Sequence, residues 1–327
     1  MEDFKIIDIH VHLCRTPEEE SNYFPIPGRR VQDRWATPER VITYMDQRGI
    51  SKMAFMILIP RQLRAPLYEK AKLWELPEEQ RRQGEKKLSP QIASLMREMN
   101  EWGCGIGRSF PRLLPFIGMS NDFGSGEAMA EEVTLRASQG AKGVKLHPGQ
   151  FSYFPNDKMS WPMYEKCQEL SLPVLSDSGP WPHSHLMMVY PNPLGLELHK
   201  TKREFAEPDN FARVLEAFPR LTLILAHLGS AWWDERLELA QKYPNVYFDT
   251  SQGFAAPDRI PVVAHRGLAE EDAVRVFRKI GVERIIFGTD FPGIDPQPQL
   301  EQIIRLPLTD EEKRMILVEN AQRILRI

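Results

Sequence analysis

The chain has 327 residues, of which 42% are hydrophobic and 27% are charged, and its formal net charge is -3. This composition is typical of a globular protein with a substantial core, and so small a charge gives no electrostatic basis for binding nucleic acid or an anionic membrane. Three widely spaced cysteines, Cys14, Cys104 and Cys167, argue against a disulfide framework, so we expect a reducing, cytoplasmic location. We also expect no signal peptide and no membrane span, because the sequence lacks both patterns.

Short apolar segments recur along the chain, and each is followed by a segment with helical periodicity. This alternation is typical of βα units and a parallel sheet. The eight predicted strands are residues 4–10, 52–58, 113–119, 143–147, 172–177, 221–227, 246–250 and 284–290. They predict an α/β protein with a single (β/α)8 TIM barrel domain over residues 1–327. No glycine fingerprint follows a strand, which disfavours an open dinucleotide-binding sheet.

Capping signals predict where several helices begin. Ser89-Pro90 places a capping hydroxyl before a proline at the first helical position, and the apolar stripe that follows predicts a helix to Gly103. Thr37-Pro38 and Pro208 predict two further helix starts in the same way. Residues 309–312 form a capping box that predicts the start of the last helix.

Four connections are long, namely residues 14–36, 59–88, 178–206 and 251–269. They follow predicted strands one, two, five and seven, so we expect long loops over the C-terminal mouth of the barrel, where barrel enzymes keep their active sites. Arginines in these loops, Arg15, Arg61 and Arg64, are candidates to bind a carboxylate with two parallel hydrogen bonds.

Polar side chains end five of the predicted strands. They are His10 and His12, His147, Asp177, His227 and Asp290. His10 and His12 share one face of the first strand, because alternate residues of a strand point the same way. Each of these residues, taken alone, is explained as a helix cap or as a buried polar group whose hydrogen bonds are satisfied. Together at one barrel mouth they predict a metal centre, since imidazole nitrogen and carboxylate oxygen are ligands for divalent transition metals.

Five motifs then connect the sequence to a known family. They are Ile-Asp-Ile-His-Val-His at 7–12, Gly-Val-Lys-Leu-His-Pro at 143–148, Leu-Ala-His-Leu-Gly at 225–229, Arg-Ile-Ile-Phe-Gly-Thr-Asp-Phe-Pro at 284–292 and Glu-Asn-Ala-Gln-Arg-Ile-Leu at 319–325. With these motifs in this order, the chain resembles the amidohydrolase superfamily, and within it the amidohydrolase 2 family, which contains the aminocarboxymuconate semialdehyde decarboxylase-like enzymes. The resemblance implies that His10, His12 and Asp290 bind a metal with one ligand from the fifth strand, and that His227 is an acid/base group.

The fifth strand departs from the family pattern, because Asp177 stands where the family usually has histidine. Three interpretations are open. Asp177 binds the metal itself, which would move the preference from zinc toward manganese or iron. Alternatively, His147, His183 or His185 supplies the ligand. In the third interpretation Asp177 is a general base in a site with little or no metal.

Lys145 lies two residues before His147 and shares its face of the fourth strand. In binuclear relatives a carbamylated lysine on this strand bridges two metals, but His147 is nearer the mouth here, so we expect one divalent ion. Zinc is the expected ion, with manganese and iron as alternatives. The predicted substrate-binding residues are His147, Lys145, Arg61, His183 and His185.

The leading functional hypothesis is metal-dependent hydrolysis of a small carboxylate, amide or lactone, in which the metal activates water, Asp290 takes its proton and His227 polarises the carbonyl group. The alternative is a lyase that decarboxylates, or a hydratase that acts on, an unsaturated or aromatic carboxylic acid with the same metal site. A barrel that has lost its chemistry is a third hypothesis. The expected partner is a small-molecule substrate, and a homodimer is left open.

Overall fold

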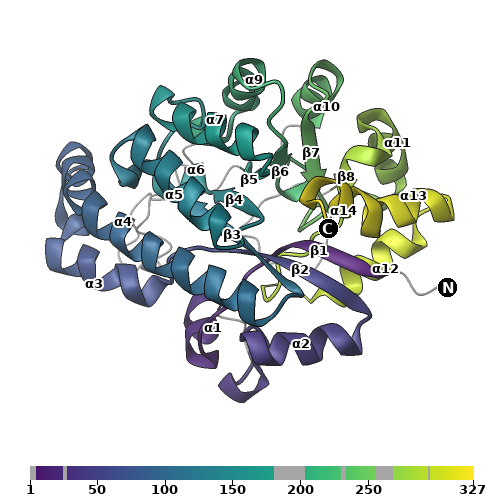
Figure 1. Ribbon diagram of the computed structural model, residues 1–327, viewed down its shortest axis with the longest axis horizontal. Coiled ribbons are helices and arrows are strands. Elements are labelled where there is room, and N and C mark those ends of the chain that lie inside the picture. Colours follow the sequence, from purple (N-terminus) through teal and green to yellow (C-terminus); the bar gives the residue numbers. More distant parts are fainter. Residues whose placement is uncertain (1–4, 25–27, 180–202, 230–232, 255–267, 294) are drawn as a thin grey trace.

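The computed structural model describes residues 5–24, 28–179, 203–229, 233–254, 268–293 and 295–327. Eight parallel strands form one sheet in chain order, and helices surround them (Figure 1). The strands are β1 (Ile6–Val11), β2 (Ile50–Met56), β3 (Leu113–Met119), β4 (Gly143–Leu146), β5 (Val174–Ser176), β6 (Leu223–Leu225), β7 (Val246–Asp249) and β8 (Ile285–Ile286). All eight predicted strands are therefore confirmed.

Backbone hydrogen bonds join the first strand to the segment at and after the last. Ile9 N donates to Phe287 O at 3.0 Å, and Asp290 N donates to His10 O at 2.7 Å. His12 N donates to the carbonyl oxygen of Phe291, also at 2.7 Å. These bonds bring the two ends of the sheet together, so the (β/α)8 TIM barrel is confirmed and the polar ends of β1 and β8 become neighbours.

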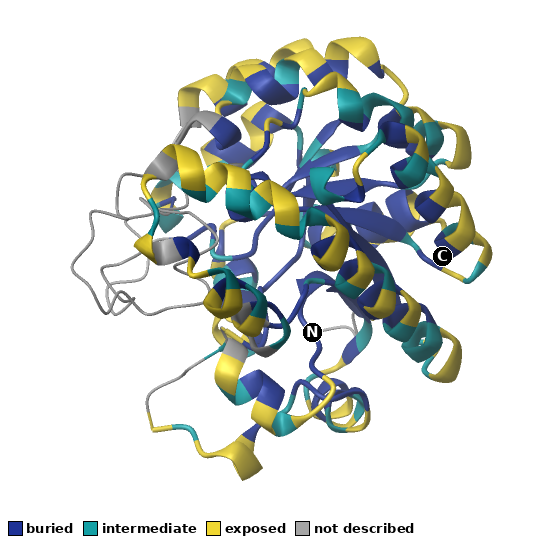
Figure 2. Ribbon diagram, turned by 90° about the vertical axis from the view of Figure 1, so that its left-hand side faces the viewer, coloured by how far each residue is buried: buried dark blue, intermediate teal, exposed yellow. Residues whose placement is uncertain are grey.

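Thirteen α-helices are described around the barrel. They are α1 (Pro17–Tyr23), α2 (Pro38–Gln47), α3 (Arg61–Ala71), α4 (Glu78–Ser109), α5 (Gly126–Ser138), α6 (Pro148–Phe151), α7 (Trp161–Leu170), α9 (Pro208–Ala217), α10 (Trp233–Lys242), α11 (Glu270–Ile280), α12 (Pro296–Arg305), α13 (Asp310–Arg314) and α14 (Asn320–Leu325). Figure 2 shows buried strands at the centre and exposed residues on the outer faces of the helices. Strands covered on both faces explain the continuous apolar segments of the sequence.

Most predicted helix starts are confirmed. Helix α2 begins at Pro38, α9 begins at Pro208, and the Thr309 capping box precedes α13. The start at Ser89-Pro90 is wrong, because α4 runs from Glu78 through Pro90 to Ser109. The glutamate, glutamine, arginine and lysine residues before Pro90 are strong helix formers, and the Ser89 hydroxyl donates to Asp122 Oδ1 at 2.6 Å instead of capping.

The four long connections were predicted to be loops, and the structure differs from that prediction in two of them. Residues 59–88 are not a loop, because they contain α3 and the first part of α4. Residues 14–36 include the short helix α1. Most of 178–206 and 251–269, including His183 and His185, lies outside the described residues. None of the helices in the described ranges is long and apolar enough to cross a membrane.

Candidate metal centre

The ends of β1 and β8 bring three predicted ligands together. His12 Nε2 lies 3.0 Å from Asp290 Oδ1, and His10 Nε2 lies 3.8 Å from the same oxygen. Candidate ligand atoms of these three buried residues all fall within 4.8 Å of one another. Two imidazole nitrogens and one carboxylate oxygen form a donor set that suits zinc, manganese or iron(II), so the residues present fit the metal that the motifs imply.

Local structure holds these ligands in place. Asp8, on the same face of β1, accepts from Thr289 Oγ1 at 2.6 Å and from His10 N at 3.1 Å, which ties β1 to the turn that carries Asp290. Burial raises the pKa of Asp8 to about 7. Gly288 permits the close approach, because a Cβ there would lie 3.0 Å from the Cβ of His10.

The hydrogen bonds of His10 and His12 fix which ring nitrogen is available. His10 Nδ1 lies 2.9 Å from Asp249 Oδ2, an oxygen that can only accept when ionised, so Nδ1 carries the proton. His12 Nδ1 donates to Met56 O at 3.3 Å. In both rings Nε2 faces Asp290, and Nε2 is the nitrogen that a histidine presents to a metal when its Nδ1 donates to a carboxylate or a backbone carbonyl oxygen.

Lys145 on β4 lies beside His10. Its Nζ lies 3.2 Å from His10 Nε2, and the side chain is buried. Burial lowers the pKa of this lysine below its usual value, against the opposing effect of Asp177 and two other carboxylates. Lys145 therefore places a nitrogen beside Nε2 of His10, the atom that would bind a metal.

A second group of candidate ligands, His10, His227 and Asp249, surrounds the hydroxyl of Ser251. Ser251 Oγ lies 3.0 Å from His10 Nδ1 and 2.9 Å from His227 Nδ1, and it donates to Asp249 Oδ1. Because the hydroxyl lies between these groups, we interpret them as a hydrogen-bonded network and not as a second metal site. The network connects β1, β6 and β7 at the mouth.

Asp249 anchors this network. Its Oδ1 also accepts from His227 N at 3.1 Å and from Ser251 N at 2.9 Å. Burial alone would raise the pKa of Asp249, but the charge and hydrogen bond of His10 help to lower it below its usual value. Asp249 therefore stays ionised, orients the ring of His10 and holds the backbone of His227.

Asp177 faces two histidines. Its Oδ2 lies 3.1 Å from His227 Nε2 and 3.9 Å from His147 Nε2, and its Oδ1 accepts from Gly179 N at 3.2 Å. Neither group of converging ligand atoms includes Asp177. The histidines lower the pKa of Asp177 well below its usual value, although burial opposes this.

His227 has oxygen acceptors at both ring nitrogens, since Nδ1 also lies 3.0 Å from Ser251 O. A histidine that donates from both nitrogens is an imidazolium. Burial lowers its pKa, but the hydrogen bond and charge of Asp177 outweigh this and raise the pKa to about 9. His227 and Asp290 both have left-handed backbone, with φ of 62° and 65°, a strained conformation that often occurs at functional sites.

The remaining predicted substrate-binding residues are placed as follows. His147 lies at the end of β4, where its Nδ1 accepts from Gln150 N at 3.2 Å and caps α6, so it faces Asp177 with Nε2. Arg61 is the first residue of α3, which follows β2 at the same end of the barrel. Sequence reasoning missed Asp249 and Ser251, although they too are polar residues at the C-terminal end of a strand.

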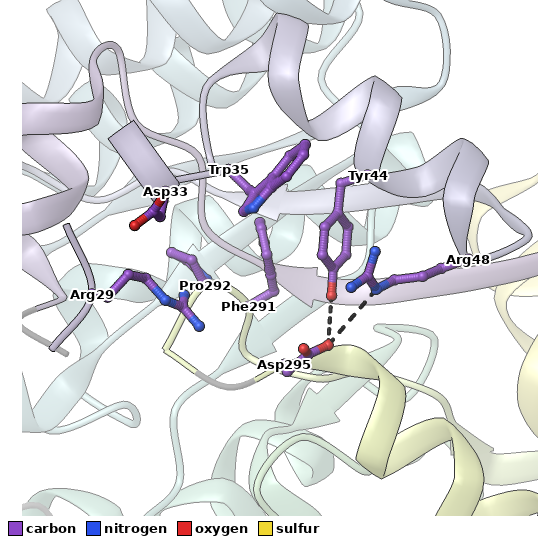
Figure 3. Close-up of a pocket in the computed structure, with 8 residues that line it drawn as sticks. All are labelled: Arg29, Asp33, Trp35, Tyr44, Arg48, Phe291, Pro292 and Asp295. Atoms are coloured by element: carbon purple, nitrogen blue, oxygen red, sulfur yellow. Dashed lines mark hydrogen bonds and ion pairs between the residues drawn. The ribbon is translucent and has the colours of Figure 1, made fainter. Parts of the chain in front are cut away.

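A pocket of about 100 Å³ lies against the turn that follows Asp290 (Figure 3). Phe291 and Tyr44 contact each other in it, with ring centroids 4.8 Å apart. Tyr44 donates to Asp295 Oδ1 at 2.7 Å, and the Arg48 guanidinium stacks on the Tyr44 ring at 3.8 Å. These contacts pack Tyr44 and Arg48 of α2 against Phe291 and Asp295, in the segment that follows Asp290.

A family model described as amidohydrolase matches residues 7–327. The chain belongs to the amidohydrolase 2 family. No curated protein matches this sequence. Among solved structures, 2,6-dihydroxybenzoate decarboxylase from Rhizobium is 16% identical, with a TM-score of 0.66 and 98% of each chain covered.

Two other solved structures are similar to the same extent. The 5-carboxyvanillate decarboxylase from Sphingomonas paucimobilis is 15% identical, with a TM-score of 0.64 and 99% of each chain covered. A dihydroxybenzoic acid decarboxylase from Polaromonas sp. with bound manganese is 15% identical, with a TM-score of 0.66, and covers 98% of this chain and 96% of its own. At these identities the likeness shows a shared fold.

Proposed function

We propose that this amidohydrolase is a metal-dependent decarboxylase of an aromatic or unsaturated carboxylic acid. The observation that carries the proposal is the buried Asp177–His227 ion pair, which holds a protonated imidazole beside the metal ligands. Decarboxylation needs a proton donor, because a hydrogen replaces the carboxyl group. The names of the similar structures, all three decarboxylases of aromatic acids, support this reaction over the hydrolysis that the sequence led us to favour.

The proposed ion is manganese or zinc, held by His10, His12 and Asp290. When bound, it supplies a positive charge that binds and polarises substrate oxygen atoms. Asp290 is kept ionised for this role, because its hydrogen bond to His12 and the charges of the nearby histidines lower its pKa, although burial opposes this. The ligand role predicted for Asp177 stays a prediction, and the pair with His227 is the role proposed here.

In the proposed reaction the bond between the ring carbon and the carboxyl carbon breaks, and carbon dioxide leaves. The electron pair stays on the ring carbon, which takes the proton held by the Asp177–His227 pair. Asp177 remains ionised throughout, and His227 regains its proton from solvent. Lys145 and His147, which line the same space, are proposed to contact the substrate anion. Positioned acids of this kind contribute about 10²–10⁴-fold to rates.

Carbon dioxide release from a panel of hydroxylated benzoic acids, compared with ring opening of lactones and amide hydrolysis, tests the proposal. We expect carbon dioxide release from at least one acid, and a loss of about 10²–10⁴-fold in His227→Asn with metal retained. Asp46→Asn, which changes an exposed carboxylate on α2, is the matched control and should keep full activity. Hydrolysis of amides or lactones without carbon dioxide release from any acid would refute the decarboxylase assignment.

A further inference from the structure

Arg236 of α10 is a buried arginine that has no part in the reaction proposed above. It is 1% exposed, and its Nη2 donates to the carbonyl oxygens of Ser178 at 2.8 Å and of Ala206 at 3.1 Å. The guanidinium carbon lies 5.1 Å from the ring centroid of Phe211. Moving a cation out of water costs free energy, and these two carbonyl groups recover part of that cost. Arg236 is therefore held in a fixed position beside the segment that follows β5.

The charge of Arg236 acts on Asp177. Burial lowers the pKa of Arg236 to about 9, and the negative charge of Asp177 is the largest effect that opposes this. The guanidinium group is therefore still a cation at neutral pH. Ser178, whose carbonyl oxygen Arg236 binds, directly follows Asp177 in the chain. The arginine and the carboxylate are thus coupled both through charge and through the backbone between them.

The peptide group between Ser178 and Gly179 connects Arg236 to the Asp177 carboxylate. Its carbonyl oxygen accepts from Arg236, and its N–H, on Gly179, donates to Asp177 Oδ1 at 3.2 Å. Because a peptide group is planar, a bond that fixes its oxygen also fixes the direction of its N–H. A cation at the carbonyl oxygen also polarises the group and strengthens the hydrogen bond that its N–H donates. Arg236 therefore holds Oδ1 through one rigid unit, while Oδ2 lies 3.1 Å from His227 Nε2.

Ser178 is also bound to the strand end that carries His227. Its Oγ donates to Ala226 O at 2.9 Å, and Ala226 N donates to Ser176 O at 3.0 Å. Ala226 directly precedes His227. A shift of the Ser178 backbone would therefore change the position of the Asp177 carboxylate relative to the His227 ring.

We infer that Arg236 is a positioning residue, which directs the Asp177 carboxylate at His227 through the peptide group between Ser178 and Gly179. The inference rests on the proposed function, in which the Asp177–His227 pair supplies the proton. The described hydrogen bonds of Arg236 go to backbone carbonyl oxygens and not to the predicted metal ligands. Its loss should therefore slow proton transfer and leave the affinities for metal and substrate nearly unchanged. A misplacement of about 1 Å in a catalytic group can lower a rate by about 10²-fold.

Steady-state kinetics of metal-loaded Arg236→Met, with an acid from which the wild type releases carbon dioxide, test this role. We expect kcat to fall about 10–100-fold, with KM and metal content within about threefold of the wild type. In Arg236→Lys the ammonium group can still donate to the Ser178 carbonyl oxygen, so most of the lost kcat should return. A rise in KM with unchanged kcat, or a lysine variant no faster than the methionine variant, would overturn the inference.

Arg136→Met is the matched control. Arg136 on α5 is also buried, at 4% exposed, and also donates to a backbone carbonyl oxygen, that of Arg97 at 3.2 Å. It has no described contact with the residues of the candidate metal centre. The control should keep its kcat, and a loss equal to that of Arg236→Met would show that burying methionine in place of arginine slows the enzyme in general.

Crystal structures of the zinc-loaded wild type and Arg236→Met test the same role without turnover. In the variant we expect the distance from Asp177 Oδ2 to His227 Nε2 to exceed about 3.5 Å, beyond hydrogen-bond range, or the carboxylate to occupy a second orientation. An unchanged pair with an unchanged Gly179 contact would overturn the inference. If Arg236→Met does not fold, Arg236→Gln, whose shorter side chain cannot reach Ser178, takes its place in both measurements. If the pair moves but the wild type releases carbon dioxide from no acid, the proposed function fails and the positioning role stands.

Discussion

Replacing Asp177 with asparagine should destabilise the metal-free protein near neutral pH and have little effect in alkali. Burial lowers the pKa of His227, but Asp177, with smaller contributions from Asp290 and Asp249, outweighs this and raises the pKa from 6.5 to about 9. At about 1.4 kcal/mol for each pKa unit, the net shift corresponds to roughly 3 kcal/mol, and Asp177 is its largest favourable cause. Because the folded-state pKa is raised, this stability is fully present below pH 6.5 and is lost as the pH rises through about 9.

Thermal unfolding of chelator-treated wild type and Asp177→Asn, followed by circular dichroism at pH 6 and pH 10, measures this contribution. At roughly 2 °C for each kcal/mol in a domain of this size, the variant should unfold about 6 °C lower at pH 6 and nearly together with the wild type at pH 10. Asp46→Asn, an exposed carboxylate, should change the melting temperature little at either pH. An equal difference at both pH values would refute the claim that Asp177 holds His227 as a cation.

Two further predictions concern the network and the core. Asp249→Asn should weaken metal binding by about 10–100-fold in chelator competition, because the ionised acceptor that orients His10 is lost; affinity within threefold of the wild type would contradict this. Phe116→Ala should cost about 3–5 kcal/mol in chemical denaturation, because Phe116 on β3 is buried and packs against Gly143 of β4. A loss of less than about 1 kcal/mol in the free energy of unfolding would show that neighbouring side chains fill the space left by the Phe116 ring.

The fold could be predicted because the barrel depends on repeated local signals. Eight apolar segments, each followed by a segment with helical periodicity, determine the strands. Capping residues such as Thr309 mark helix starts, because a cap is a hydrogen bond between residues close in sequence. The extent of α4 could not be predicted from Ser89-Pro90, because the proline costs a hydrogen bond and a clash with the preceding turn, and the buried residues after it in the same helix offset that cost by packing on the core.

The site was predicted in part, for a similar reason. His10, His12, His227 and Asp290 stand at strand ends, where the fold alone brings them together. Asp249 and Ser251 follow the same rule, but aspartate and serine after a strand are also common turn residues, so their signal is weak. Their role depends on distances across three strands, and those distances exist only once the barrel has closed.

The residue at position 177 determines what His227 can do. With aspartate at position 177, His227 Nε2 faces a carboxylate oxygen, which only accepts hydrogen bonds. His227 Nδ1 faces the carbonyl oxygen of Ser251. Both ring nitrogens can therefore donate a proton to an oxygen. A histidine at 177 would replace that acceptor with a neutral ring, and the same His227 would lose its second proton more easily. In the proposed reaction Asp177 would therefore make His227 a proton donor, while His10, His12 and Asp290 keep their converging arrangement.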